Sequence, residues 1–478
     1  MVAPRALRRG VSTVNVFNSR NADNVLAPSP FQHITTERGF LPTPDPVRRL
    51  AISHLDPAAA EWEAALQDIP KLAVAAEAGG ERTAAGAAAA AAASRGALRR
   101  ALEALPPFPI DKLPLPLSPA TTAGPAAAIG AIEAEAAKVA LGSETADEAA
   151  AGSGELWRAY LMLSFLAHAY MWCEPGPPPA VLPAVLAVPW VRVAAALDMP
   201  PVLTYASYNL YNWRRLDPTG PVRLGNIVCL QNFLGGPDEE WFRLVHVEIE
   251  ARAGSAVAAG EGGLEAMQRA AEAGDSDAVL AGLIRIAEAL RDMQATLSRM
   301  GEKCDPYIYY QRVRTPMSGW RNNPNLPQGL IYEGVSPEPV QLYGETGAQS
   351  SILHAFDAAL GVQHEQQHTG AASASIASST TSGAAGGGGG GGAYLAGNRG
   401  SGGGGELLDA YNTAIQEMER FRSQHRAFAA SYIAKWARRE TTGTGGSDFM
   451  PALSGYRDTT GRHVLGGSVP PPAAAAVQ

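Results

Sequence analysis

Apolar residues recur at helical spacing over four long segments, and sustained strand-like alternation is almost absent. The segments are Trp157 to Cys173, Trp241 to Ala253, Leu264 to Met300 and Glu406 to Arg439. The third is long enough to form two helices. Two prolines interrupt the stretch from Ser336 to Leu342, so we predict a loop there. The pattern as a whole predicts an all-α fold.

Three stretches rich in Ala, Gly, Pro and Ser interrupt this pattern, namely residues 76 to 96, 118 to 154 and 364 to 405. The first contains the alanine run Ala87 to Ala93, and the last contains the glycine run Gly386 to Gly392. Such sequences bury too little large apolar surface to offset the entropy lost on ordering them. We therefore predict that all three are insertions or linkers.

The charge pattern argues against nucleic acid as a partner. The chain has 38 basic and 46 acidic side chains, a net charge of -8, and no basic stripe interleaved with aromatic residues. Proteins that bind nucleic acid need such a stripe to neutralise phosphates. We expect no nucleic-acid partner.

The most apolar stretch, Ala159 to Cys173, is 15 residues long and contains His168. A membrane-spanning helix needs roughly 20 apolar residues, so we predict a buried core helix and no membrane partner. The cysteines Cys173, Cys229 and Cys304 lack metal-ligand spacing. Their scatter favours a reducing compartment over a disulfide scaffold, and we expect a cytoplasmic protein.

The N-terminus, residues 1 to 30, has a composition with two interpretations. Its first 22 residues contain four arginines and no acidic residue, which is typical of organellar transit peptides. A disordered N-terminus fits the same composition equally well.

An inward-facing stripe runs along the segment Glu406 to Arg439 at alternating steps of three and four residues. Its members are Leu408, Tyr411, Ile415, Met418, Arg422, His425, Ala429, Tyr432 and Trp436. Arg422 and His425 interrupt an otherwise apolar stripe, and each is costly to bury without a partner. An iron porphyrin would supply both partners, with the imidazole on the iron and the guanidinium against a propionate or a nearby carboxylate. Periodicity alone favours a hydrogen-bonded structural histidine.

Two further local patterns compete for attention. The run His364 to His368 has the H-E-x-x-H form of a zinc-protease helix, but the low-complexity sequence after it offers no firm third ligand. The run Gly443 to Gly446 lacks the Lys-Ser/Thr ending of a phosphate-binding loop, so we interpret it as a flap.

Several ordered blocks of the chain resemble the indoleamine 2,3-dioxygenase family. They are LPAVLAVPWVRVAAALDMPPVLTYASYNLYNWRRLDP from Leu182, WFRLVHVEIEARAG from Trp241, YYQRVRTPMSGWRNNPNLPQGLIYEGV from Tyr309, GETGAQSSILHAFDAALGVQ from Gly344, FRSQHRAFAASYI from Phe421 and GTGGSDFMPALSGYRDTT from Gly443. Together they cover most of the chain outside the low-complexity inserts.

The resemblance implies a small helical domain, residues 31 to 235, packed on a larger helical domain, residues 236 to 478, that binds haem b. It implies a haem-dependent dioxygenase that opens the indole ring of L-tryptophan and related indoleamines to N-formylkynurenine, the first step of the kynurenine pathway. Dioxygen would be the co-substrate, an electron donor would keep the haem ferrous, and the protein would be a monomer. The alternative is a non-catalytic relative that binds haem and oxygen.

On the proximal side, the resemblance implies that His425 is the iron ligand. Arg422, one turn earlier, matches the arginine that supports a haem propionate. Asp357, in the AFDAALG block, matches the carboxylate that steadies this side. A plain buried ion pair between Arg422 and Asp357 is compatible with these roles.

On the distal side, the resemblance places Tyr205, Tyr208, Phe242, His246, Tyr309 and Arg314 on or near substrate or cofactor positions. Phe242, His246 and Glu250 follow one another at four-residue steps on one helix face. Arg314 matches the residue that would hold the substrate's carboxylate through two parallel hydrogen bonds.

The glycine-rich segments complete the expected site. Thr346, Gly347 and Ala348 would line the wall beside the haem, Tyr309 would contact the cofactor, and Thr444 would close over bound substrate.

The chain departs from the family pattern at two places. His246 stands where the best-known animal enzymes carry Ser, and we assign it a tuning role in preference to that of a second iron ligand. Between Gln363 and Glu406, glycine replaces a segment of the form Tyr-Met-Pro-x-x-His-Arg-x-Phe-Leu. The run from His425 to Phe428 resembles that segment, but the spacing from Arg422 and to Tyr432 supports the proximal assignment.

Overall fold

The computed structural model describes residues 34–78, 96–113, 146–258, 263–364, 404–437 and 449–465. The helices are α1 (Pro57–Ala78), α3 (Ala97–Glu103), α5 (Ala146–Trp172), α6 (Ala184–Ala196), α7 (Pro237–Val257), α8 (Leu264–Ala273), α9 (Ser276–Ser298), α10 (Pro306–Ile308), α11 (Ser351–Leu360), α14 (Gly404–Ala429) and α15 (Phe449–Gly461). The all-α class predicted from the spacing of apolar residues is confirmed.

Short elements connect the helices. The 3-10 turns are η1 (Ala51–His54), η2 (Ile110–Lys112), η5 (Arg299–Glu302), η7 (Thr315–Met317) and η8 (Gly347–Gln349), and the π turns are η4 (Ala206–Leu210), η6 (Tyr309–Val313) and η9 (Ala430–Ala434). The short strands are β1 (Val181–Leu182), β2 (Trp213–Arg215), β3 (Ile227–Cys229) and β4 (Ile331–Tyr332). In the described part of the chain β1 pairs in parallel with β4, and β2 pairs antiparallel with β3.

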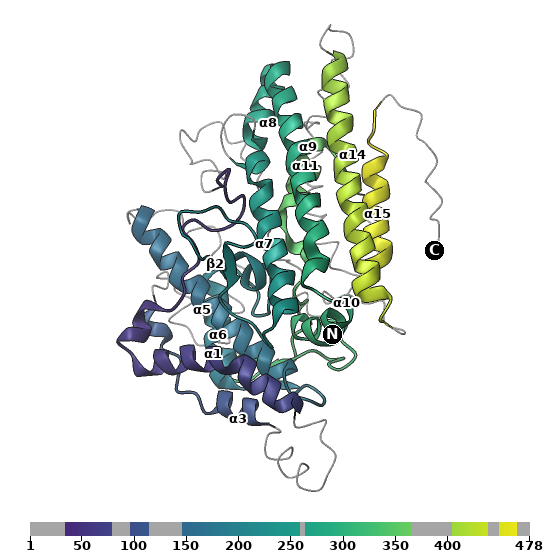
Figure 1. Ribbon diagram of the computed structural model, residues 1–478. Coiled ribbons are helices and arrows are strands. Elements are labelled where there is room, and N and C mark those ends of the chain that lie inside the picture. The colour runs from purple at the N-terminus through teal and green to yellow at the C-terminus, as the bar shows by residue number, and fades with distance from the viewer. Residues whose placement is uncertain are drawn as a thin grey trace, which may run out of the picture.

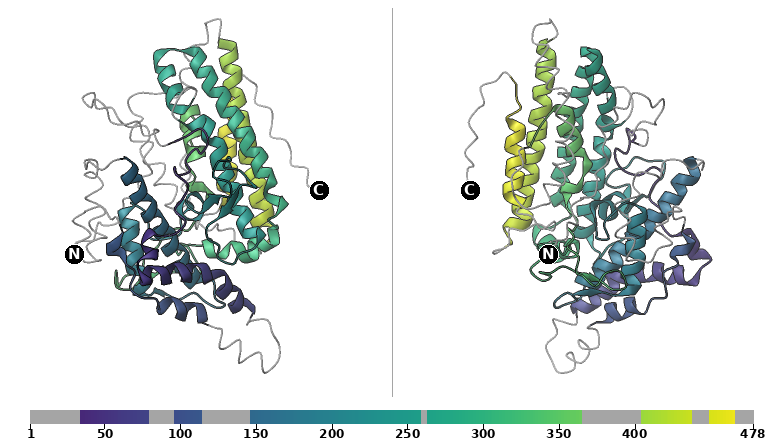
Figure 2. Two further views of the ribbon diagram at one scale, coloured as in Figure 1. Left: turned by 60° about the vertical axis from the view of Figure 1, so that its left-hand side comes forward. Right: turned by 180° about the vertical axis from the view of Figure 1, so that it is seen from behind.

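The long helices form two groups (Figures 1 and 2). Helices α7, α9, α14 and α15 run side by side, and α8 packs against α9. Helices α1, α3, α5 and α6 form the second group. In this group α5 contacts each of the other three helices. Helix α7 borders both groups, because it contacts α9 on one side and η4 on the other.

The structure corrects one predicted boundary and confirms that one predicted segment forms two helices. Helix α5 begins at Ala146, so the last part of the insertion predicted for 118 to 154 is helical. The segment Leu264 to Met300 is indeed two helices, separated at Gly274, which has a φ of 77°, and at Asp275, whose side chain caps α9. Residues 1–33, 79–95, 114–145 and 365–403 lie outside the described residues. They include the N-terminus, most of both alanine-rich stretches, and the glycine run.

The buried residues of α14 largely match the predicted stripe, but in the first turn the buried position differs by one residue. Leu407 is buried at the start of the helix, whereas the predicted Leu408 is half-buried. Tyr411, Ile415 and Met418 are buried as expected. The stripe therefore faces the neighbouring helices, and the polar positions further along it face the same way.

Helix α5 is buried on nearly all sides, as predicted for the stretch from Ala159. His168 lies within it and is fully buried, but both of its ring nitrogens have partners. Nδ1 donates to the carbonyl of Pro316 at 2.8 Å, and Nε2 accepts from the amide of Leu203 at 2.9 Å. Burial lowers the pKa of His168 to about 3, so this is a neutral, structural imidazole. Among the described helices, none is both long and apolar enough to cross a membrane.

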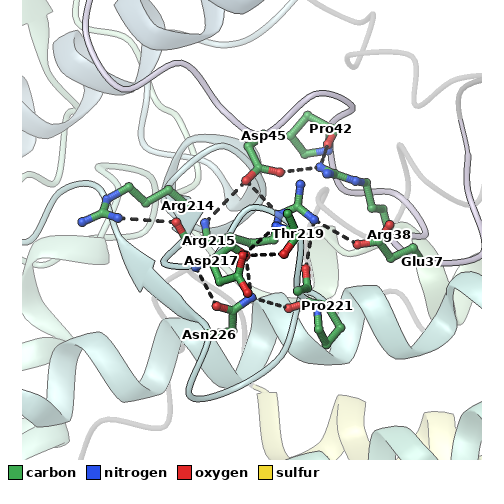
Figure 3. Close-up of polar contacts among 11 residues, drawn as sticks. Glu37, Arg38, Pro42, Asp45, Arg214, Arg215, Asp217, Thr219, Pro221 and Asn226 are labelled. Carbon is green, nitrogen blue, oxygen red and sulfur yellow. Dashed lines mark hydrogen bonds and ion pairs between the residues drawn. The ribbon is translucent and has the colours of Figure 1, made fainter.

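The segment before η1 is tied to the β2–β3 hairpin by charged side chains (Figure 3). Arg215 on β2 contacts Asp45 at 3.1 Å and Glu37 at 3.3 Å. Arg38 contacts the same Asp45 at 2.8 Å and donates to the carbonyl of Pro42 at 2.9 Å. These contacts hold the segment against the side of the molecule where α7 lies.

The same segment touches α7 backbone to backbone at two glycines. A Cβ atom on Gly254 would lie 2.5 Å from the carbonyl oxygen of Thr36 and 2.7 Å from the amide of Gly39. A Cβ atom on Gly39, which has a φ of 56°, would lie 2.4 Å from the carbonyl oxygen of Glu250. Backbone atoms cannot rotate away as side chains do, so these contacts require glycine.

We expect Gly254→Ala to lower the free energy of unfolding by about 1–3 kcal/mol, because the added methyl group forces two backbones apart. Thermal unfolding of the purified protein measures this. Gly301→Ala is the control, since a Cβ atom there would meet nothing within 4 Å. Equal melting temperatures for both variants would contradict the close approach.

Candidate functional site

Helix α7 is buried along most of its length, yet Phe242 and His246 keep accessible surface. Their neighbours Arg243, Val245 and Val247 are almost completely buried. Burial nevertheless lowers the pKa of His246, so protein surrounds this imidazole. The two side chains thus combine a small accessible surface with protein contacts on most sides, and we call the accessible space beside them the recess.

The hydrogen bond of His246 determines its tautomer. Nδ1 lies 2.7 Å from the carbonyl oxygen of Phe242, and because a carbonyl only accepts, Nδ1 carries the proton. The lowered pKa keeps the ring neutral, so Nε2 retains its lone pair. No described residue forms a hydrogen bond with Nε2.

Aromatic rings extend the wall on both sides of His246. Its ring centroid is 4.6 Å from that of Phe242 and 6.2 Å from that of Tyr205. The ring centroid of Phe242 is 4.7 Å from that of Tyr309. The ring centroid of Tyr309 is in turn 5.6 Å from that of Tyr432, which lies on η9 directly after α14. The structure thus brings four of the predicted distal residues together.

Tyr208 does not join this wall. It is completely buried and stacks near Phe165 and Phe233, with the guanidinium of Arg243 4.7 Å from its ring centroid. One helical position separates Arg243 from Phe242, which turns the two side chains to different faces of α7. Tyr208 is therefore a core residue in this fold.

His425 on α14 lies near His246. Burial, the electrostatic influence of the neighbouring His246 and the charge of Arg422 lower the pKa of His425 to about 4, so its imidazole is neutral. His425 keeps some accessible surface, as His246 does, and no described residue forms a hydrogen bond with its ring. Two neutral imidazoles, one from α7 and one from α14, therefore lie close to each other.

Arg422, one turn before His425, is held by α11 and α15. Its Nη2 contacts Asp357 Oδ2 at 2.6 Å, and its Nη1 donates to the hydroxyl of Thr460. His364 Nε2 lies 2.9 Å from the same Oδ2. His364 and Arg422 hold the pKa of Asp357 below its ordinary value although burial opposes them.

This cluster also contains polar atoms that no described residue satisfies. Arg422 Nε, Asp357 Oδ1 and His364 Nδ1 are buried without a hydrogen-bond partner. Buried polar atoms in native proteins almost always have partners. The orphaned atoms mark a place where a polar group from outside the described chain would fit.

The segment that carries the predicted wall residues Thr346, Gly347 and Ala348 is hydrogen-bonded to η4 and its N-cap. Gln349 Oε1 accepts from the amide of Tyr205 at 2.7 Å, and Glu345 Oε1 accepts from Asn209 at 3.2 Å. Gly347 and Ala348 themselves are exposed, and Thr346 is half-buried.

Glu250 and Glu345 are two buried carboxyl groups behind this wall. Glu250 accepts hydrogen bonds from Tyr205 and Ser350, at 2.9 Å and 2.7 Å. Burial raises the pKa of each carboxyl to about 7. Both groups influence the Tyr205 hydroxyl, whose pKa burial raises well above its ordinary value.

Arg314 follows the π turn η6 at the Tyr309 end of the wall. Its amide donates to the carbonyl of Tyr309 at 2.9 Å, and its side chain is half-buried. The charge of Arg314 opposes the rise in the pKa of Tyr309 that burial causes. The guanidinium is therefore near Tyr309, and its Cζ lies 5.6 Å from the ring centroid of Tyr310.

The sequence missed three members of this region. Glu345 stands within the quoted block GETGAQSS, and Thr460 within the last block, but neither residue type signals burial by itself. The sequence suggests a zinc motif that begins at His364, but the remaining residues of that motif lie outside the described chain. In the structure His364 binds Asp357. Thr444 and the neighbouring glycines also lie outside the described residues.

Comparison with known proteins gives one family. Residues 143–385 match the family described as indoleamine 2,3-dioxygenase, a match that ends before α14. Human indoleamine 2,3-dioxygenase 2 is 33% identical over 335 residues, which span 66% of this chain and 81% of that protein. The indoleamine 2,3-dioxygenase of Saccharomyces cerevisiae is 37% identical over 219 residues, 44% and 47% of the two chains. A myoglobin of Haliotis madaka is 29% identical over 314 residues, 63% and 80% of the two chains.

The raised pKa of Glu345 predicts a pH-dependent stability. The folded state holds this proton more tightly than the unfolded state, so the contribution of Glu345 is full below about pH 4.5 and is lost as the pH rises through about 7. Glu345→Gln stays neutral throughout. Relative to the unaltered protein, the free energy of unfolding of the variant should rise by up to about 3 kcal/mol between pH 5 and pH 8, and its melting temperature should rise with it.

Glu338→Gln is the control, because Glu338 is exposed. Its melting-temperature difference should not change with pH. The same flat profile for Glu345→Gln would contradict the burial of an ionisable carboxyl at that position.

Proposed function

Because this chain belongs to the indoleamine 2,3-dioxygenase family, we propose that it is a haem-dependent enzyme that opens the indole ring of L-tryptophan and related indoleamines. The product is N-formylkynurenine, and dioxygen is the co-substrate. The observation that carries the proposal is the pair of neutral imidazoles, His246 on α7 and His425 on α14, which lie close to each other and keep some accessible surface.

The residues present fit haem b. His425 offers a neutral imidazole with no hydrogen bond to a described residue, which suits an iron ligand. The unsatisfied Nε of Arg422 offers a donor to a propionate, and Asp357 fixes the orientation of that guanidinium. Thr346, Gly347 and Ala348 would lie along the porphyrin edge, and Tyr309 beside it.

Haem b, when bound, supplies the reactivity toward dioxygen that lets both oxygen atoms enter the substrate. The protein's part is to bind, orient and desolvate the indoleamine. In our proposal Arg314 holds the substrate carboxylate, and Phe242 and Tyr205 abut the indole ring.

In this proposal His246 tunes the site through Nε2, which has no hydrogen-bond partner among the described residues. As a neutral acceptor it can take a hydrogen bond from the indole N–H, and its fixed Nδ1–H prevents it from donating at Nε2. Thr444 and its glycines would close over the substrate, and an external donor would keep the iron ferrous. We divide the chain into a small domain, 31 to 235, and a haem-binding domain, 236 to 478.

A second function, haem and oxygen binding without turnover, is favoured by one observation. The myoglobin of Haliotis madaka matches this chain over a similar length as the dioxygenases do. Both functions require haem on His425, so only product formation separates them. Incubation of the haem-loaded protein with L-tryptophan, a reductant and dioxygen should accumulate N-formylkynurenine; its absence would favour the binding protein.

We expect His425→Ala to abolish the Soret band of the haem-loaded protein, because it removes the iron ligand. Absorbance after reconstitution and removal of free haem measures this. His54→Ala, at an exposed histidine on η1, should leave the band unchanged. A full Soret band in His425→Ala would exclude the proposed ligand.

We expect Arg314→Ala to raise the KM for L-tryptophan by about tenfold to a hundredfold, because the variant loses a charge-assisted hydrogen bond to the substrate's carboxylate. Steady-state kinetics measure this. Tryptamine, which lacks the carboxylate, should show little change in the same variant. An unchanged KM for tryptophan would remove Arg314 from the site.

A further inference from the structure

The buried ion pair between Arg422 and Asp357 uses only half of one edge of the guanidinium. Arg422 Nη2 lies 2.6 Å from Asp357 Oδ2. Nε–H lies on the same edge as Nη2, and the two donors together match both oxygens of a carboxylate. In the described part of the chain, however, Arg422 Nε and Asp357 Oδ1 are both buried without a hydrogen-bond partner.

A single hydrogen bond between these two side chains is unexpected. Each residue is less than a tenth exposed, and leaving buried polar atoms unsatisfied costs free energy. A small turn of the carboxylate would bring Oδ1 to Nε and satisfy both orphaned atoms at once. A further contact must therefore hold the carboxylate in its present orientation.

His364 supplies that contact. Its Nε2 lies 2.9 Å from Asp357 Oδ2, the oxygen that Arg422 already uses. Asp357 is ionised, because its pKa lies below the ordinary value despite its burial. An ionised carboxylate only accepts hydrogen bonds, so the proton lies on Nε2 of the imidazole. Two donors thus converge on Oδ2 and hold it between them.

The end of α11 places His364 beside Asp357. Gly361 ends this helix with a φ of 73°, and the amide of Val362 donates back to the carbonyl of Asp357 at 2.8 Å. The chain turns back here, which brings His364 against its own helix. On α15, the ring of Tyr456 meets the imidazole at 88°, with 4.8 Å between the ring centroids. Groups from α11 and α15 therefore hold the imidazole in place.

The opposite side of the guanidinium is fixed by Thr460 on α15. Arg422 Nη1 donates to the Thr460 hydroxyl, which in turn donates to the carbonyl of Tyr456 at 2.8 Å. With Nη1 bound to α15 and Nη2 bound to α11, the orientation of the guanidinium is set by the protein. Nε–H is the donor that remains, one helical turn before His425.

We propose that His364 is a positioning residue that keeps the contact between Asp357 and Arg422 to one hydrogen bond and so leaves Arg422 Nε–H for a haem propionate. This inference rests on the proposed function and adds a residue outside the proposed haem contacts. Without His364, the carboxylate is free to turn until Oδ1 meets Nε. The ion pair then occupies both donors of the edge, and the propionate loses its partner.

His364→Leu tests this, because it removes the Nε2–H and keeps an apolar side chain against Tyr456. The haem-loaded protein is mixed with an excess of vertebrate apomyoglobin, which captures released haem, and the Soret band follows the transfer. We expect haem to leave the variant about tenfold faster, because one charge-assisted hydrogen bond is lost. An unchanged rate would overturn the inference.

The melting temperature of the haem-free protein distinguishes positioning from a structural role. In His364→Leu the two orphaned atoms gain each other as partners, so the haem-free variant should melt at the same temperature as the unaltered protein or higher. A histidine needed only for packing would lower the melting temperature when it is replaced. Faster haem loss together with a clearly lower melting temperature would overturn the inference, as would failure of both His364→Leu and His364→Met to fold.

His364→Gln is the conservative variant, because the amide Nε2 of glutamine lies as many bonds from Cα as the imidazole Nε2 and also carries a hydrogen. It should restore the slow haem loss of the unaltered protein. A rate as fast as that of His364→Leu would contradict the role of the hydrogen bond. His54→Ala, at an exposed histidine on η1, is the control and should leave the rate unchanged.

Arg422→Lys tests whether His364 acts through the guanidinium. Lysine keeps the positive charge but lacks the Nε–H edge, so His364→Leu should add little to the rate of haem loss in that background. Equal fold-changes in both backgrounds would overturn the inference. Absence of a Soret band in the unaltered protein would refute the proposed function together with this inference. A Soret band with equal rates in all His364 variants would refute the role of His364 alone.

Discussion

The enclosure of α7 is the constraint on which the rest of the structure depends. This helix carries buried charges, and each must be satisfied by a neighbouring element. Glu239, in its first turn, accepts the backbone amides of Phe233, Leu234 and Gly235, and also contacts Arg243 at 3.2 Å. These bonds fix the rotation of the helix about its axis. That rotation decides that Phe242 and His246 face the recess while Arg243 faces the core.

Three desolvated histidines differ in how many hydrogen bonds their rings make. His168 has partners on both ring nitrogens, His246 on one, and His425 on neither among the described residues. Burial lowers the pKa of all three, so all are neutral and burial alone does not separate them. The ring nitrogens that have no hydrogen-bond partner among the described residues belong to His246 on α7 and His425 on α14, which are close enough to influence each other.

The two sides of the site are also linked through one short segment. Ser350 caps the start of α11 and donates to Glu250 on α7, and α11 then carries Asp357, which holds Arg422 on α14. A single ten-residue helix and its cap thus position groups on both α7 and α14. The placement of Glu345 and Gln349 against η4 keeps the connecting segment in one conformation.

The helical pattern by itself determined the all-α class, the four main helical segments and the inward direction of the stripe that carries Arg422 and His425, because a 3.6-residue period records which face is buried. The ordered blocks determined the family. Only the tertiary structure decided that Tyr208 belongs to the core, that α5 begins inside a predicted insertion, and that His364 pairs with Asp357. It alone revealed the buried carboxyls of Glu250 and Glu345, because the burial and partners of an acidic residue depend on which distant segments close over it, and local spacing contains no record of those contacts.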